Sequence, residues 1–302
     1  MCAKKKVVFI INPFSGTSAK ESIPELISRT FDTNKYDYSI QFTEYAGHAI
    51  ALSKEAANKK VDIAVAVGGD GSVNEVAQSL LGSDTCLGIL PGGSGNGFAM
   101  HLGLGRNQEK AIDFINTGKT ITVDTCTVND RFFANVAGIG FDARIAFMTK
   151  KNKKRGFLPY FSTSMKESSK FKPTSLEINI DGQQIQGEYA AAVVANASMY
   201  GYHFTIAPGA SLQDGIMDIM LIKKAPLYKY FLTSYRFLNR SLHLSRITET
   251  YQGKELNIKL SEEDYLHVDG EGYESELDLT FRIHPKSLKV IVPNIKNVNW
   301  PL

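Results

Sequence analysis

The segment Val61-Asp-Ile-Ala-Val-Ala-Val67-Gly-Gly-Asp-Gly-Ser-Val-Asn-Glu75 decides how the first third of this chain folds. An apolar run ends at three glycines that surround one aspartate, and a helical pattern follows them. A short apolar run bounded by turn residues is typical of a buried strand, and glycine lets the backbone turn sharply and approach another group closely. The segment therefore predicts a buried strand, a tight turn and a helix.

The predicted helix has its own start signal and one apolar face. Ser72 and Glu75 have the spacing of a capping box. The free N–H groups and the dipole of a helix N-terminus attract anions. Asp70 lies among these donors, where a carboxylate would repel a phosphate unless Mg²⁺ or a magnesium-bound water stands between them. A tight turn with a capping aspartate is the alternative for this loop taken alone.

Two further loops follow predicted strands of the same kind. Asn12-Pro13-Phe14-Ser15-Gly16 comes after the apolar residues 7–11, and Pro91-Gly-Gly-Ser94-Gly-Asn96-Gly comes after residues 86–90. Parallel strands bring their carboxyl ends to one edge of the sheet, where open α/β sheets bind ligands. The loops offer hydroxyls, amides and backbone N–H groups, so together they predict a polyphosphate site.

Two familiar nucleotide motifs are excluded by spacing. A Walker A loop needs a glycine where Asp113 precedes Gly118-Lys119-Thr120. The dinucleotide pattern Gly-x-Gly-x-x-Gly is also absent, because its last glycine is replaced by Asn74 in one loop and by Met100 in the other.

Composition places the chain among ordinary globular proteins. It has 302 residues, of which 43% are hydrophobic and 22% charged, and this length favours two domains. Lys and Arg total 34 against 31 Asp and Glu, and a net charge of +3 is too small to indicate a nucleic-acid partner.

Cysteine usage and the first residues indicate a cytoplasmic protein. Cys2, Cys86 and Cys126 cannot form a disulfide framework, which favours a reducing compartment. The apolar residues 7–11 are too few for a secretion signal or a membrane span. We expect a cytoplasmic location, and peripheral contact with the inner face of the membrane stays open.

The pattern of the chain changes near residue 123. Residues 1–124 alternate strands and helices and predict a three-layer α/β domain that binds a nucleotide. Residues 125–302 carry many short strands and predict a β-rich domain, a sandwich, with a tail that either stays there or returns to the first domain. We expect one helix to interrupt the sandwich, at residues 226–246. Its apolar residues at helical spacing favour core packing over the alternative, a lipid slot: Tyr228, Phe231, Leu232, Tyr235 and Leu238.

The motifs together resemble the diacylglycerol kinase catalytic-domain family, which includes soluble bacterial lipid kinases and sphingosine kinases. Asn-Pro-x-Ser-Gly, Gly-Gly-Asp-Gly-Ser-x-Asn-Glu and Pro-x-Gly-Ser-Gly-Asn are followed in the family's order by Val123-Asp124, Asp214-Gly-x-Met217-Asp218 and Val268-Asp269-Gly-Glu271. The resemblance implies a lipid kinase that uses ATP and Mg²⁺. Gly-Gly-Asp-Gly alone also suits NAD kinases and phosphofructokinases.

The resemblance also implies roles for individual residues. Asp70 would organise the catalytic Mg²⁺, with Asp124 in the same water network. A second, structural Mg²⁺ would be held by the Asp214 carboxylate and by the carbonyl groups of Ser211 and Ile216. ATP would be bound by Asn12, Pro13, Phe14, Ser15, Gly16, Thr43, Gly69, Asp70, Gly71, Ser72, Val73, Asn74, Glu75 and Ser94.

A carboxylate of the Asp269-Gly270-Glu271 segment would act as the general base. A lipid hydroxyl is a weak nucleophile, so a carboxylate within hydrogen-bond reach helps by accepting its proton. We favour Glu271 as the base and Asp269 as its orienting partner, roles that the sequence does not separate. The alternative for this segment is an ordinary Asp-Gly hairpin, like Asp181-Gly182.

The sequence defines the phosphoryl-transfer reaction better than it defines the acceptor lipid. Thr17, Gly97 and Met100-His101 depart from the soluble bacterial pattern, which leaves both diacylglycerol and a sphingoid base as acceptors. The basic stretch Lys150-Lys-Asn-Lys-Lys-Arg155 and the apolar residues 157–161 could meet a membrane surface. A soluble-substrate kinase of the NAD kinase type, a non-catalytic nucleotide or lipid sensor, and a homodimer stay open.

Overall fold

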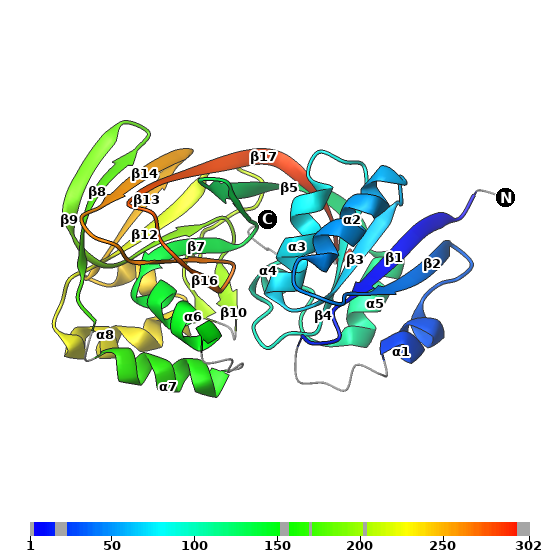
Figure 1. The fold of residues 1–302 in the computed structure, drawn as a ribbon, viewed down its shortest axis with the longest axis horizontal. Coiled ribbons are helices and arrows are strands. Elements are labelled where there is room, and N and C mark those ends of the chain that lie inside the picture. The colour runs from blue at the N-terminus through cyan, green and yellow to red at the C-terminus, as the bar shows by residue number, and fades with distance from the viewer. Residues whose placement is uncertain (1–2, 16–22, 152–156, 169–170, 202–203, 295–302) are drawn as a thin grey trace. The chain divides into compact units, whose positions relative to one another are not determined.

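A computed structural model describes residues 3–15, 23–151, 157–168, 171–201 and 204–294 (Figure 1). The chain divides into two compact units. Among the described residues, unit 1 comprises those up to Val123 together with 286–294, and unit 2 comprises Asp124–Pro285. Each unit has an apolar core of its own.

Unit 1 is built on a parallel sheet in the order β17–β4–β3–β1–β2. Every residue of β3 and β4 is buried, as the apolar runs predict for a sheet covered on both faces. The strands are β1 (Lys5–Ile11), β2 (Tyr36–Phe42), β3 (Ile63–Gly68), β4 (Cys86–Pro91) and the last part of β17 (Asp278–Val292), with the start of β5 (Lys119–Val128) beside it.

Helices cover both faces of this sheet. Alternate strand residues such as Phe9 and Val65 pack with α1 and α5, while α2 and α3 pack together over the other face (Figure 1). The predicted three-layer α/β architecture is therefore confirmed. The helices are α1 (Ile23–Thr30), α2 (His48–Asn58), α3 (Asp70–Leu80), α4 (Gly97–His101) and α5 (Gln108–Thr117).

The predicted capping box at the start of α3 is wrong. The helix begins at Asp70 with Gly69 as its N-cap, and no side chain caps it. Ser72 therefore already lies inside the first turn, and its hydroxyl accepts a hydrogen bond from the Asn12 side chain at 3.2 Å. The Glu75 carboxylate accepts from the backbone N–H of Gly47 at 3.0 Å instead of turning back to the helix start.

Unit 2 is an antiparallel β-sandwich, as the sequence predicts. Its longest strand path runs β16–β15–β7–β9–β8–β14–β17 around a core that includes Phe133, Val194 and Phe281. The strands are β5, β6 (Arg131–Phe133), β7 (Val136–Gly140), β8 (Thr174–Ile180), β9 (Gln183–Ala195), β10 (Met199–Gly201), β11 (Phe204–Thr205), β12 (Met217–Lys223), β13 (Thr248–Gly253), β14 (Glu255–Leu260), β15 (Tyr265–Val268), β16 (Glu271–Glu274) and β17.

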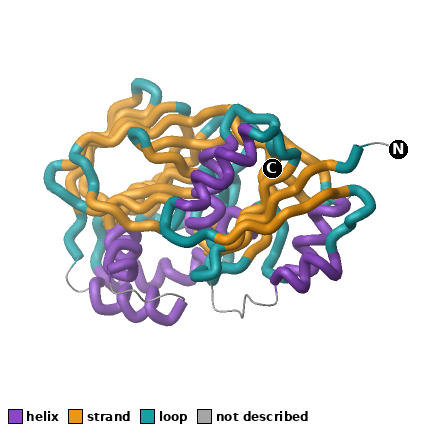
Figure 2. Tube along the Cα trace, turned by 45° about the vertical axis from the view of Figure 1, so that its right-hand side comes forward, coloured by secondary structure: helices purple, strands orange, loops and turns teal. Residues whose placement is uncertain are grey.

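The helices of unit 2 differ from the prediction of one long helix. Two helices that the sequence analysis missed follow β7: α6 (Phe141–Lys151) and α7 (Phe157–Ser168). The predicted helix over 226–246 is α8 (Leu227–Ser234), followed only by short 3-10 helices at Tyr235–Phe237 and Leu242–Leu244 (Figure 2). Arg240 between them adopts φ 57°, a left-handed conformation that ends a right-handed helix.

The predicted core packing of that segment is also wrong. The side chains expected in the core are exposed to between 55% and 74% of their area. Helical spacing shows that one face is apolar, but it does not show which surface covers that face. Within the described part of the chain, no helix is both long enough and apolar enough to cross a membrane.

Candidate active site

The glycine loops after β3 and β4 lie against each other, backbone to backbone. The N–H of Gly92 donates to the carbonyl of Gly68 at 2.7 Å. A Cβ atom placed on Gly93 would come within 2.5 Å of the Cα of Gly69. None of these glycines has a positive φ. Glycine is needed here because two backbones must approach more closely than any side chain allows.

The loop after β1 joins the same cluster. The N–H of Asn12 donates to the carbonyl of Val67 at 3.1 Å, and the Asn12 side chain reaches Ser72. Ser15 is buried, and its hydroxyl oxygen lies 2.9 Å from the place that a Cβ on Gly68 would occupy. The structure thus brings together the three loops that the sequence assigned to phosphate binding.

The remaining predicted nucleotide contacts surround these loops. The N–H of Thr43 donates to the carbonyl of Ile11 at 2.8 Å, which places Thr43 beside the end of β1. Pro13 and Phe14 are exposed on the first loop, whereas Val73 is buried and faces the core. Gly16 lies outside the described residues.

Asp70 is oriented by the loop after β4. One carboxylate oxygen accepts the N–H of Asn96 at 2.8 Å. Asn96 is buried, has φ 53°, and bonds through its side-chain amide to both the N–H and the carbonyl of Gly93, at 3.2 and 2.7 Å. The Asp70 carboxylate is therefore held at the sheet edge by a loop that is itself fixed.

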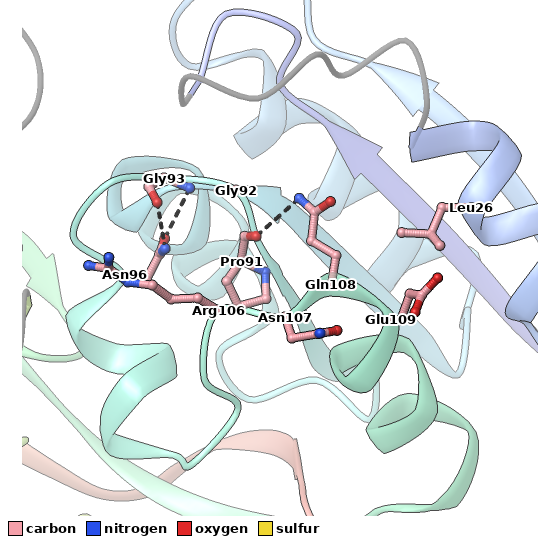
Figure 3. Close-up of a pocket in the computed structure, with 9 residues that line it drawn as sticks. All are labelled: Leu26, Pro91, Gly92, Gly93, Asn96, Arg106, Asn107, Gln108 and Glu109. Carbon is pink, nitrogen blue, oxygen red and sulfur yellow. Dashed lines mark hydrogen bonds between the residues drawn. The ribbon is translucent and has the colours of Figure 1, made fainter.

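A pocket of about 390 Å³ opens beside this loop (Figure 3). Gly93 and Asn96 line it on one side, and the first residues of α5 line it on the other. The Gln108 amide donates to the carbonyl of Pro91 at 3.2 Å, and the Arg106 guanidinium donates to the carbonyl of Ser94 at 2.7 Å. Sequence reasoning missed Arg106 because a lone arginine in a loop has no distinctive spacing.

The turn between β15 and β16 places Asp269 and Glu271 in different surroundings. The sequence alone did not assign them separate roles. Asp269 and Gly270 form a two-residue hairpin turn with φ 47° and 85°. Asp269 is buried, and its carboxylate accepts the backbone N–H groups of Ala134, Asn135 and Val136 at 3.0, 3.0 and 3.1 Å. This carboxylate fixes the start of β7 to the turn.

Glu271 stands on the other side of the turn and is exposed. Its carboxylate accepts the Tyr273 hydroxyl at 2.9 Å, and the Lys150 ammonium lies 3.5 Å away. Burial, followed by the charge of Glu271, raises the pKa of Tyr273 above its ordinary value of 10. Lys150 belongs to the basic stretch, of which residues 152–156 lie outside the described residues.

A second carboxylate cluster surrounds the loop before β12. Asp124 is fully buried and accepts the N–H of Gly215 at 2.7 Å. Asp214 accepts the N–H of Ile216 at 3.1 Å, and the second oxygen of Asp218 is buried without a hydrogen-bond partner. Burial raises the pKa of both Asp214 and Asp218, and the neighbouring carboxylates raise each of them further.

Comparisons with known proteins identify the family of this chain. The diacylglycerol kinase catalytic domain model matches residues 6–128, and the YegS C-terminal NAD kinase beta sandwich-like domain model matches residues 135–292. The chain belongs to the diacylglycerol kinase family. It is 32% identical to a diacylglycerol kinase of Bacillus subtilis (strain 168), over 97% of this chain and 98% of that protein. A diacylglycerol kinase of Staphylococcus carnosus (strain TM300) is 29% identical over 97% of each chain.

Solved structures share the fold of this diacylglycerol kinase family member. A putative diacylglycerol kinase from Bacillus anthracis str. Sterne matches with a TM-score of 0.76 and 23% identity, over 96% of this chain and 98% of that one. An NAD kinase from Archaeoglobus fulgidus, solved in complex with ATP, matches with a TM-score of 0.51 and 14% identity, over 96% and 94%. The β-sandwich is thus common to two kinds of kinase.

The Asp124–Asp214–Asp218 cluster fits a hard divalent cation. Carboxylates with raised pKa values and a buried oxygen without a partner indicate negative charge that a cation would balance. Among the residues described, no group of three or more His, Cys, Asp or Glu side chains is arranged to hold a metal by itself. The ligand set that the resemblance implies also includes the backbone carbonyls of Ser211 and Ile216, which lie in the same loop as Asp214.

Sequence reasoning missed a partly buried triad of side chains, His267, Asp142 and Tyr200. His267 lies with its Nε2 2.9 Å from an Asp142 oxygen, to which the Tyr200 hydroxyl also donates at 2.5 Å. Nδ1 of His267 and the other Asp142 oxygen are buried without a hydrogen-bond partner. The position of His267, two residues before Asp269, was the only available signal, and nothing in the sequence connected it to Asp142.

Proposed function

We propose that this protein transfers the γ-phosphate of ATP, with Mg²⁺, to the hydroxyl group of a lipid such as diacylglycerol or a sphingoid base. One observation carries the proposal: the three polar loops of unit 1 interlock around Asp70. Diacylglycerol is named by the relatives, and ATP by the NAD kinase structure.

The loops of unit 1 would bind and orient the nucleotide. The backbone N–H groups of Gly69, Gly71, Ser94 and Gly95, with the Ser94 hydroxyl, are donors of the kind that a polyphosphate needs. Asp70 would hold Mg²⁺, which supplies charge neutralisation when it is bound. Phosphoryl transfer needs little covalent help, so positioning and electrostatic stabilisation account for most of the catalysis.

Glu271 would accept the proton of the lipid hydroxyl. It is exposed, and the Tyr273 hydroxyl and the Lys150 ammonium both contact the same oxygen, Oε2, so the proton would be accepted by Oε1. Asp269 is unsuited to that role because three backbone N–H groups already occupy its carboxylate. Asp269 would instead position the turn that presents Glu271, and the Asp124–Asp214–Asp218 cluster would hold a structural Mg²⁺.

The acceptor would be reached at a membrane. Diacylglycerol and sphingoid bases lie in bilayers, so the proposal includes peripheral contact with the inner face of the cell membrane and no nucleic-acid partner. A lipid hydroxyl lies near the headgroups, which a peripheral protein can reach without a membrane span.

The test is transfer of labelled phosphate from ATP to dispersed lipids. We expect transfer that requires Mg²⁺ and falls about 10²–10⁴-fold in Glu271→Gln, the range that general-base catalysis supplies. Asp70→Asn should lose a comparable amount. Glu274→Gln and Asp113→Asn, two exposed carboxylates in the same units, are matched controls that should keep full activity. Undiminished transfer by Asp70→Asn or Glu271→Gln would contradict the site assignment.

A second candidate is a soluble-substrate kinase of the NAD kinase type. The fold match to an ATP-bound NAD kinase is the observation that favours it. A panel of NAD, diacylglycerol and sphingosine under one assay distinguishes the two, because phosphorylation of NAD alone would replace the lipid proposal. ATP binding by calorimetry without turnover of any acceptor would indicate a non-catalytic sensor.

A further inference from the structure

Two side chains hold the same oxygen of the Glu271 carboxylate. The Tyr273 hydroxyl donates to Oε2 at 2.9 Å, and the Lys150 ammonium lies 3.5 Å from that oxygen. Within the part of the chain that the structure describes, no group forms a hydrogen bond or an ion pair with Oε1. An exposed glutamate side chain rotates freely about its bonds, so contacts that concentrate on one oxygen restrict its orientation and leave the other oxygen uncovered.

The ring of Tyr273 is itself fixed by its surroundings. On β16 it lies opposite Leu266 of β15, and the ring packs against the apolar core of the sandwich. The Arg131 guanidinium lies 4.4 Å from the ring centroid, and the Lys150 ammonium lies 4.6 Å from it. Cations over an aromatic face are attracted to the ring. The hydroxyl that contacts Glu271 is therefore carried by a ring that core packing and two cations hold in place.

Helix α6 brings Lys150 to this carboxylate because the helix lies directly on β16 (Figure 1). Gly272 stands between Glu271 and Tyr273 in the strand. A Cβ atom on Gly272 would clash with the backbone N and Cα atoms of Phe147 in the helix. The helix backbone thus touches the strand between the base and the tyrosine, and Lys150 follows less than one turn later.

The first turn of α6 is anchored to the same hairpin. Nε2 of His267 lies 2.9 Å from an oxygen of Asp142, and the Tyr200 hydroxyl donates to that oxygen. His267 is the residue of β15 that pairs with Gly272 of β16. The helix is therefore attached at its first turn, in its middle and at its end to the hairpin that carries Glu271.

We propose that Tyr273 and Lys150 are positioning residues that hold Oε2 of Glu271, so that Oε1 receives the proton of the acceptor hydroxyl. As the acceptor oxygen bonds to the γ-phosphorus, its proton moves to Oε1, and the bond from the γ-phosphorus to the bridging oxygen breaks with its electron pair left on ADP. Oε2 is then the carbonyl oxygen of a neutral carboxyl group and still accepts from both donors. The inference rests on the proposed function, because it names the groups that hold its base.

Tyr273 should contribute more than Lys150. Its hydroxyl lies at an ordinary hydrogen-bond distance from Oε2 and is carried by a partly buried ring. The side chains of Lys150 and Glu271 are 55% and 49% exposed. Exposed ion pairs contribute little and are screened by salt. We therefore assign the larger effect to the hydroxyl and a smaller, salt-dependent effect to the ammonium.

The test is kinetics of the full-length protein with ATP, Mg²⁺ and short-chain diacylglycerol or sphingosine dispersed in detergent. Tyr273→Phe removes only the hydroxyl, and we expect kcat and the single-turnover rate to fall about tenfold while both KM values stay unchanged. Tyr251→Phe is the matched control, because Tyr251 packs against the same core and its hydroxyl makes no hydrogen bond within the described residues. The control should keep the wild-type kcat, and both variants should have the same urea midpoint.

A double-mutant cycle distinguishes positioning from a structural role. In the Glu271→Ala background there is no carboxylate to hold. Adding Tyr273→Phe to that background should therefore change the residual kcat by less than about twofold. A structural role of the hydroxyl would lower kcat by the same factor in both backgrounds.

The contribution of Lys150 has its own variants and control. Lys150→Met should lower kcat about threefold at low ionic strength and by less in high salt, where the pair is already screened. Lys150→Arg should keep the wild-type rate, because it restores a cation. Lys151→Met removes the neighbouring exposed lysine of α6 and should have no effect. Equal losses in Lys150→Met and Lys151→Met would exclude Lys150 as a positioning residue.

The possible failures can be told apart. An active wild type whose kcat is unchanged in Tyr273→Phe would overturn the inference and leave the proposed function in place. The same holds if Tyr273→Phe costs an equal factor with and without Glu271, or if Tyr251→Phe loses as much activity. A wild type that phosphorylates no acceptor would overturn the proposed function and the inference with it.

Discussion

The glycine loops of unit 1 and the acidic turns of unit 2 are organised by opposite means. In unit 1, backbones approach each other directly, and the glycines act through the side chains that they lack. In unit 2, carboxylates of Asp269 and Asp124 are fixed by backbone N–H groups from other strands and loops. The glycine loops of unit 1 should therefore lose stability when side-chain atoms are added. The acidic turns of unit 2 should lose stability when a carboxylate charge is removed.

The largest effects should come from the two carboxylates of the β15–β16 turn, and they should differ in kind. Glu271→Gln should lower kcat about 10²–10⁴-fold and leave the free energy of unfolding unchanged. Asp269→Asn should lower the free energy of unfolding by about 2–4 kcal/mol, because charge-assisted hydrogen bonds to buried N–H groups are lost. Urea denaturation and steady-state kinetics of both variants measure this split. Equal loss of stability in both would show that the turn does not separate their roles.

The glycine contact in unit 1 gives the next effect. Gly93→Ala would press a methyl group against the backbone of Gly69, and we expect a loss of about 2–3 kcal/mol in stability together with weakened ATP binding. Gly209→Ala is the matched control, since no atom lies within 4 Å of the added Cβ and its φ is not positive. Calorimetric ATP titration and urea denaturation check both variants. A Gly93→Ala protein as stable and as tight in ATP binding as the control would show that the close approach of Gly93 to Gly69 does not exclude a side chain.

Metal binding to the carboxylate cluster should stabilise unit 2. We expect Mg²⁺ to raise the Tm by a few degrees in the wild type and by less in Asp214→Asn, because the variant removes one negative charge from the cluster. The metal-dependent rise should shrink as the pH falls, since protons compete for carboxylates whose pKa values are raised. Thermal denaturation with and without Mg²⁺ at several pH values measures this. A rise that is equal in the wild type and in Asp214→Asn would exclude the cluster as the site.

The smallest predicted effect concerns Asp218 without metal. Its pKa is raised above the ordinary 3.8, so the folded protein holds this proton more tightly than the unfolded chain does. That contribution to stability is present below pH 3.8 and is lost as the pH rises through the folded-state pKa. Asp218→Asn should therefore raise the Tm by about 2 °C at neutral pH without Mg²⁺ and by less at lower pH. A Tm gain of Asp218→Asn that increases as the pH falls would contradict a raised pKa of Asp218.

The sequence predicted the parts of the fold that local pattern controls. The apolar pattern of residues 61–67 predicted a buried strand, and the strand is buried because the sheet is covered on both faces. Asp181-Gly182 predicted a hairpin turn, and both residues adopt the positive φ that such a turn needs. The helices α6 and α7 were missed because the end of α6 merges into the basic stretch. The outward face of α8 was misread because periodicity does not identify the packing partner.

In the candidate site, too, the sequence predicted the parts that a local pattern controls and missed those that depend on distant residues. The loop residues were found because their motifs follow strands directly. The separate roles of Asp269 and Glu271 depend on which backbone N–H groups the turn brings within reach, and those come from residues more than 130 positions away. The Asp142–His267 contact spans 125 positions and leaves no local pattern at all.

The strand β17 has a consequence for how the chain is made. It begins in the sandwich and ends beside β4, where Val290 pairs with Leu87 and is fully buried. During synthesis on the ribosome, unit 1 therefore cannot complete its sheet until the end of β17 has emerged, which happens only after all of unit 2. Until then the edge of β4 has no neighbour, so a truncated or stalled chain would display an unpaired apolar strand to chaperones and proteases.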